Sequence, residues 1–107
     1  MDHDLGPSYP GTVVLDLGAG TGALIVYTGP DAYRQEIEVS LVSEPQCRTH
    51  AAVRERRLVG RTAYCAVYPG LVAGEYIVWR DAATRCATAT VAGGAVTELH
   101  LPAGEPA

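Results

Sequence analysis

The side chains that could do chemistry are few and scattered along this sequence of 107 residues. A serine hydrolase exposes its nucleophile on a strained turn of the form Gly-x-Ser-x-Gly, and no serine of this chain stands in such a turn. The histidines are isolated from one another in sequence. The serines are Ser8, Ser40 and Ser43, and the histidines are His3, His50 and His100. The sequence therefore favours a non-catalytic protein, and we assign no catalytic residue.

Two further groups of residues could bind a metal or move a proton. A metal site from His50, Cys65 and His100 would depend entirely on the fold, because no ligand spacing such as Cys-x-x-Cys links them. Glu36 and Glu38 share one face of a predicted strand, where we expect them to face solvent rather than form a catalytic pair. Small buried thiols and surface imidazoles are the expected state, so we predict no metal and no cofactor.

The composition restricts the partners. The chain has no lysine, so eight arginines oppose twelve aspartates and glutamates, and the net charge is −4. Nucleic acids and anionic membranes both need a cationic surface, which this balance does not offer. No apolar run has the length of a transmembrane helix, and Met1–Pro7 lacks the basic and apolar regions of a signal peptide. We expect a cytoplasmic protein with no nucleic acid partner and no membrane insertion.

An aromatic cluster around Tyr68, Ile77 and Trp79 could bind a protein partner. Alternation along a strand places Tyr76 and Val78 inward, so Ile77 and Trp79 fall on the opposite face. An exposed Ile–Trp pair would be an interface, because aromatic residues dominate binding hot spots. In the alternative, neighbouring loops or arginine stems cover the pair.

A basic run forms the second cluster. Five arginines, opposed by Glu55, fall between residues 48 and 61 of an otherwise acidic chain. They could dock an acidic partner or a phosphate, or they could line a solvated hairpin and pair with Glu36 and Glu38. Sign separation also suggests self-association, in which the arginine face of one copy meets an acidic face of another. The predicted interface residues are Trp79, Ile77, Tyr68, Arg54, Arg56 and Arg57.

Short β-rich runs separated by turn residues predict the fold. We expect strands at 12–17, 23–27, 36–41, 62–68, 75–79, 86–91 and 95–101. A tight turn at Pro69–Gly70, an apolar plug at Leu71 and a restart at Gly74 would form the central corner. Residues 47–58 fit a strand that turns back near Gly60, which we prefer, or a short helix. The predicted fold is all-β, a single antiparallel β-sandwich of about seven strands. Its parts are a flexible segment at 1–11, the domain at 12–101 and a tail at 102–107.

Residues 13–22, Val-Val-Leu-Asp-Leu-Gly-Ala-Gly-Thr-Gly, resemble the first motif of Rossmann-like methyltransferases, in which a glycine loop lies against S-adenosylmethionine. That chemistry needs a helix after the glycines and a much longer chain. Residues 23–30 are β-branched in part and end at Gly29–Pro30, so we expect a glycine-rich hairpin. A small hydrolase or minimal S-adenosylmethionine binder is the alternative function, beside a small-ligand carrier.

The segment from Val67 to Val78 resembles the signature of prealbumin-like sandwich domains, which include transthyretin-like, carboxypeptidase-regulatory-like and Cna B-type modules. The resemblance rests on Gly70-Leu71, on Gly74-Glu75-Tyr76-Ile77-Val78 and on a closing hairpin at 87–101. It implies a prealbumin-like Greek key and a binding or spacer role. The isopeptide bond of many Cna B-type modules needs lysine and asparagine, and the chain has neither.

The chain as a whole also resembles short, arginine-rich, lysine-poor actinobacterial proteins, some of them labelled phospholipase. The absence of a nucleophile turn argues against that activity here. The sequence thus predicts a cytoplasmic, non-catalytic protein–protein interaction module, acting as a homo-oligomer or as a small subunit of a larger assembly.

Overall fold

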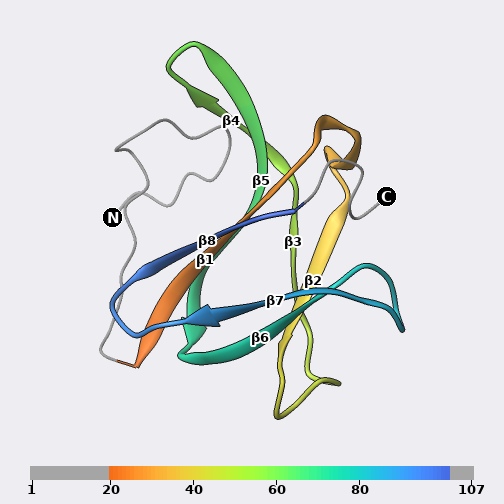
Figure 1. The fold of residues 1–107 in the computed structure, drawn as a ribbon, viewed down its shortest axis with the longest axis vertical. Coiled ribbons are helices and arrows are strands. Elements are labelled where there is room, and N and C mark those ends of the chain that lie inside the picture. The colour runs from red at the N-terminus through yellow and green to blue at the C-terminus, as the bar shows by residue number, and fades with distance from the viewer. Residues whose placement is uncertain (1–19, 102–107) are drawn as a thin grey trace.

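Eight β-strands and one short 3₁₀ helix make up residues 20–101, the part of the chain that this computed structural model describes (Figure 1). The helix η1 spans Pro30–Ala32. The strands are β1 (Thr21–Thr28), β2 (Glu36–Leu41), β3 (Thr49–Ala52), β4 (Arg54–Leu58), β5 (Arg61–Val72), β6 (Gly74–Trp79), β7 (Arg85–Val91) and β8 (Val96–His100). The predicted all-β class is confirmed.

The strands form two sheets of four strands each. One sheet has the order β4-β5-β1-β8 and the other has the order β3-β2-β6-β7. Neighbouring strands are antiparallel except β1 and β8, which run parallel. The parallel pair corrects our expectation of antiparallel pairing throughout. The prediction of a closing hairpin at 87–101 is also wrong. The turn at 92–95 takes the chain from one sheet to the other, so β7 does not pair with β8.

The two sheets share one hydrophobic core. The strands alternate as the sequence predicted, with Ile37 and Val39 of β2 inward, and Leu101 is buried in the same core. The main contributors from the first sheet are Leu24, Val26, Ala66, Tyr68 and Leu71. Those from the second sheet are Ile37, Val39, Tyr76, Val78, Ala89 and Val91. Each sheet therefore buries one face against the other.

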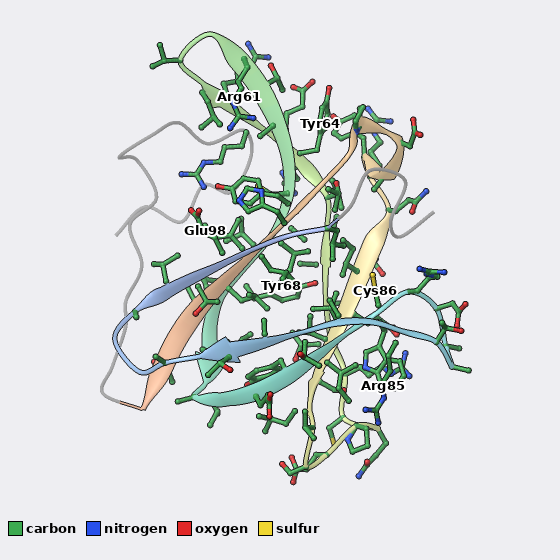
Figure 2. The ribbon with its side chains drawn as sticks, viewed as in Figure 1. Arg61, Tyr64, Tyr68, Arg85, Cys86 and Glu98 are labelled. Carbon is green, nitrogen blue, oxygen red and sulfur yellow. The ribbon has the colours of Figure 1, made fainter. Side chains whose placement is uncertain are left out.

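Tyr68 links the two sheets across this core. Its side chain lies in the interior, between the sheets (Figure 2). From β5 of one sheet, the hydroxyl donates a hydrogen bond to the carbonyl oxygen of Ile37 on β2 of the other, at 2.5 Å. Burial raises the pKa of this hydroxyl well above its ordinary value of 10.0. The phenol therefore stays protonated and remains a donor throughout the neutral range.

The predicted Pro69–Gly70 turn is wrong. β5 continues through both residues to Val72. In the register with β1, the two residues stand opposite Ala23 alone, which makes a β-bulge. A bulge tolerates proline because the ladder is locally interrupted and the missing N–H is not needed there.

The chain turns instead at Ala73, between β5 and β6. Leu71 is buried as predicted and belongs to the core. The hydroxyl of Tyr76 donates to the carbonyl oxygen of Val72 at 2.6 Å, so a side chain of β6 ties down the end of β5. This bond is of the kind made at tyrosine corners in β-sandwiches.

Within residues 47–58, 49–52 and 54–58 are strands and no helix forms, which confirms the preferred strand. β3 pairs with β2 and β4 pairs with β5, so one stretch crosses from sheet to sheet at the buried residue Val53. Val59 and Gly60 join β4 to β5, and Gly60 has φ +79°, which glycine adopts without strain. The predicted hairpin near Gly60 is confirmed.

The glycine-rich motif is only partly described. The predicted strand at 12–17 and the segments at 1–11 and 102–107 lie outside the described residues. Gly22 lies within β1, where an added Cβ would stand 2.2 Å from the carbonyl oxygen of Ala92. The close approach of two backbones therefore requires glycine at this position.

We predict that Tyr68→Phe lowers the free energy of unfolding by about 1 kcal/mol, because it removes a buried hydrogen bond between the sheets. Urea denaturation measures this, with Tyr33→Phe, at a site 41% exposed, as the matched control. The raised pKa in the folded state also means that ionisation favours the unfolded chain, so stability falls as pH rises above about 10. Tyr68→Phe should flatten that fall. Equal effects of the two variants would contradict the assigned role.

Candidate protein-interaction surface

Four of the eight arginines lie on the β4–β5 hairpin, which projects beyond the two sheets (Figure 1). Arg54, Arg57 and Arg61 are exposed. Val59, at the tip, is 94% exposed. The hairpin therefore presents cationic side chains around an apolar tip.

The hairpin's arginines divide between its two faces. Arg54 and Arg56 stand beside Cys65 and Ala63 on one face, while Arg57 lies on the other. Glu55 is the one acidic residue of the hairpin, and its carboxylate lies 3.6 Å from the Arg57 guanidinium. The hairpin is consequently positive on a chain whose net charge is −4.

Arg56 belongs to a polar cluster on the outer face of its sheet. Its Nη1 donates to the Tyr27 hydroxyl at 2.7 Å, and that hydroxyl donates to Glu98 Oε2 at 3.4 Å. His100 stacks on the Tyr27 ring with centroids 4.5 Å apart. Glu98 and its neighbours are drawn in Figure 2. The cluster ties β4, β1 and β8 together, so Arg56 is a partly buried structural residue rather than a free surface cation.

The same cluster lacks a competent nucleophile. Cys65 stands opposite Tyr27 in the β1–β5 register and is 3% exposed. Burial raises the pKa of the Cys65 thiol, which lowers its thiolate fraction at neutral pH. Burial likewise raises the pKa of Tyr27, although Arg56 opposes that shift. Both groups are therefore neutral near pH 7.

Trp79 lies on the outer face of the second sheet, as alternation predicted, but it is covered. It is 8% exposed, and the Arg48 guanidinium lies 3.7 Å from its ring centroid. Its Nε1 donates to Ser40 Oγ at 2.9 Å. Ile77 is fully buried. The prediction that Ile77 and Trp79 are exposed is therefore wrong. The alternative, in which an arginine covers the pair, is observed at Trp79.

Three oxygen acceptors hold Arg48 over the indole ring. Its guanidinium donates to Glu38 Oε1 at 2.8 Å and to the carbonyl oxygens of Asp81 and Ala82 at 3.2 and 2.6 Å. The Asp81 carboxylate in turn accepts two backbone N–H groups of its own turn, and these bonds hold its pKa below the usual range. The β6–β7 turn is thus shaped to receive Arg48.

The six predicted interface residues do not form one surface. Arg54, Arg56 and Arg57 lie together on β4, Ile77 and Trp79 lie on the other sheet, and Tyr68 lies between the sheets. The sequence analysis offered arginine cover of the aromatic pair and pairing of the basic run with Glu38, and Arg48 does both, but it missed Tyr27 and His100. Their neighbours come from distant strands, and only the sheet order brings them together.

The other predicted groups are also dispersed. Residues 20–101 contain no cluster of histidine, cysteine and acidic side chains that could hold a metal. His50 Nδ1 lies 3.3 Å from Glu36, and His100 stacks on Tyr27. Glu36 and Glu38 each face a basic side chain, so they do not form a catalytic pair.

A hollow of about 300 Å³ opens at the base of the hairpin, where the chain crosses between the sheets. Its lining includes His50, Arg54, Glu55, Cys65 and Val67. Arg54 lies beside apolar lining residues such as Val67, so the hollow could accept a partner's side chain next to a guanidinium group.

We predict that Arg48→Ala shifts the fluorescence emission of Trp79 to longer wavelength, because the indole ring becomes exposed to water. The same substitution should lower the free energy of unfolding by about 1–2 kcal/mol, because the cation–π contact and the hydrogen bonds to the β6–β7 turn are lost. Trp79 is the only tryptophan of the chain, so its fluorescence is unambiguous. Arg34→Ala is the control, since Arg34 lies 5.2 Å from the exposed ring of Tyr33. An unchanged emission spectrum would show that Arg48 does not cover the ring.

We predict that a maleimide labels Cys47 rapidly in the native protein and Cys65 only when the fold opens. Cys47 is exposed, whereas Cys65 is buried and its thiol pKa is raised by burial. Peptide mass spectrometry after timed labelling distinguishes the two sites, and urea should remove the difference. Equal native rates would mean that the outer face of the sheet is open at Cys65.

No helix among residues 20–101 is long and apolar enough to cross a membrane. Comparison of the chain with family models, with curated proteins and with solved structures finds no match.

Proposed function

We propose that this chain is a non-catalytic protein–protein interaction module, of the prealbumin-like β-sandwich type, that binds acidic protein surfaces through the β4–β5 hairpin. The observation that carries the proposal is the exposed group of Arg54, Arg57 and Arg61 beside Val59 at the hairpin tip. Within the hairpin itself, Glu55 is the one carboxylate that can offset these cations, and it lies 3.6 Å from Arg57.

The hairpin suits this role chemically. A guanidinium presents a planar set of donors that matches a carboxylate, so exposed arginines favour acidic partners. Val59 would bury apolar surface at the centre of such a contact, with the arginines around it. β1 pairs with β5 from Tyr64 to Val72, which anchors the base of the hairpin in the sheet before binding. A rigid surface loses less conformational entropy on association.

The wider context of the proposal is a cytoplasmic protein that works as a homo-oligomer or as a small subunit of an assembly. Cys47 and Cys65 carry free thiols, which favours a reducing compartment. The shared core of two four-stranded sheets supports the sandwich type.

Catalysis has less support. Within residues 20–101, the Cys65 thiol is buried, and the Ser40 hydroxyl is buried and accepts a hydrogen bond from Trp79. Gly22, the last glycine of the motif that resembles a cofactor loop, is packed against the backbone of Ala92. These three groups are engaged in packing, so none of them is presented to a substrate.

We predict that a polyglutamate peptide binds the wild-type protein and that Arg57→Glu/Arg61→Glu weakens binding at least about tenfold, because close charge pairs become repulsive. Isothermal titration at two salt concentrations measures the affinity and its electrostatic part. Arg34→Glu/Arg85→Glu changes the net charge equally at exposed sites outside the hairpin and serves as the matched control. Equal losses in the two double variants would leave only a general charge effect and contradict a hairpin site.

A further inference from the structure

We infer that the free edge of β7 is a self-association site, where the β7 strands of two copies pair antiparallel about a two-fold axis. The inference deepens the proposed function by naming a second copy of this chain as one partner. It rests on the backbone of an edge strand, a surface separate from the arginine hairpin. β7 is an edge because it pairs with β6 alone among the described strands.

The direction of the backbone groups on β7 follows from the ladder. The N–H of Val42 donates to the carbonyl oxygen of Glu75 at 2.9 Å, so Glu75 directs its backbone toward β2. The alternate residues of β6 therefore bond to β7, and their partners are 87, 89 and 91. Thr88 and Thr90 consequently point their N–H and C=O groups away from β6. The Thr97 hydroxyl confirms this direction, because it donates to the carbonyl oxygen of Thr90 at 2.8 Å.

The side chains of Ala87, Thr88 and Ala89 leave the middle of this edge open to another strand, whereas the carbonyl oxygen of Thr90 already accepts from the Thr97 hydroxyl. Exposed edge strands are usually kept from pairing with another chain by charged residues, by proline or by a segment that covers them. β4 carries arginines, and β8 carries Glu98 and His100, but residues 86–91 of β7 are Cys-Ala-Thr-Ala-Thr-Val, without charge, proline or glycine. β7 and β8 also diverge from their connecting turn (Figure 1), so β8 does not cover the middle of β7.

The sequence of β7 is compatible with pairing to itself. In a register centred on Thr88, that residue opposes its own copy and Ala87 opposes Ala89 of the other chain. Arg85 opposes Val91, so no like charges meet, and threonine pairs across strands are favourable. Thr88 would exchange two backbone hydrogen bonds with its copy. The two copies would then share one continuous eight-stranded sheet. The dimer would be closed, because both copies use the same strand in the interface.

Sedimentation velocity over a concentration series, with native mass spectrometry, tests the inference on the full chain. We expect a monomer–dimer equilibrium in the wild type. Thr88→Lys should raise the dimer dissociation constant by about tenfold, since two cations then stand opposite each other. Thr88→Pro, which removes an outward N–H without breaking the β6 ladder, should abolish the dimer. Thr49→Lys places the same substitution on the exposed edge strand at the other side of the same sheet and should change nothing.

The outcomes separate this inference from the proposed function. A dimer that survives Arg57→Glu/Arg61→Glu and is lost in the Thr88 variants supports the β7 edge. A dimer that survives both Thr88 variants, or a wild type that is monomeric at every concentration, overturns it. Neither result affects binding of polyglutamate by the hairpin, which fails or succeeds on its own titration. Circular dichroism of each variant confirms that it is folded.

Discussion

The hydrogen bond from the Tyr68 hydroxyl to the carbonyl oxygen of Ile37 fixes how the two sheets meet. A buried hydroxyl needs a partner, and here the partner belongs to the opposite sheet, so the two layers have one favourable alignment. The same strand that carries Tyr68 continues outward as one arm of the arginine hairpin. The position of the hairpin on the surface therefore depends on a contact made in the core.

The aromatic residues on β5 and β6, Tyr68, Tyr76 and Trp79, are used for internal packing. Tyr68 lies between the sheets, Tyr76 ties the end of β5, and Trp79 is sandwiched between its sheet and Arg48. Each ring has its polar atom satisfied within the chain. Aromatic residues that would form a binding hot spot if they were exposed are therefore buried within the fold. The surfaces that we propose for partners are therefore the charged hairpin and the backbone edge of β7.

Local patterns in the sequence predicted much of the fold and little of the site. The alternation of Glu36–Leu41 gives the bounds of β2, and Gly60 marks the hairpin, because both depend on neighbours in sequence. Pro69–Gly70 became a bulge instead of a turn because its outcome depends on register with the distant strand β1. The cover of Trp79 by Arg48 and the parallel pairing of β1 with β8 are likewise set by sheet order, which local propensity does not contain.

We propose that association uses the hairpin and the β7 edge rather than the aromatic cluster. A dilution series of two-dimensional amide NMR spectra tests it directly. We expect concentration-dependent shifts at the backbone N–H groups of Thr88 and its neighbours, while the resonance of the Trp79 indole N–H stays fixed, since this group donates a hydrogen bond to Ser40. Shifts centred on the Trp79 indole and Ile77, with Thr88 unchanged, would contradict the claim and return the interface to the aromatic cluster.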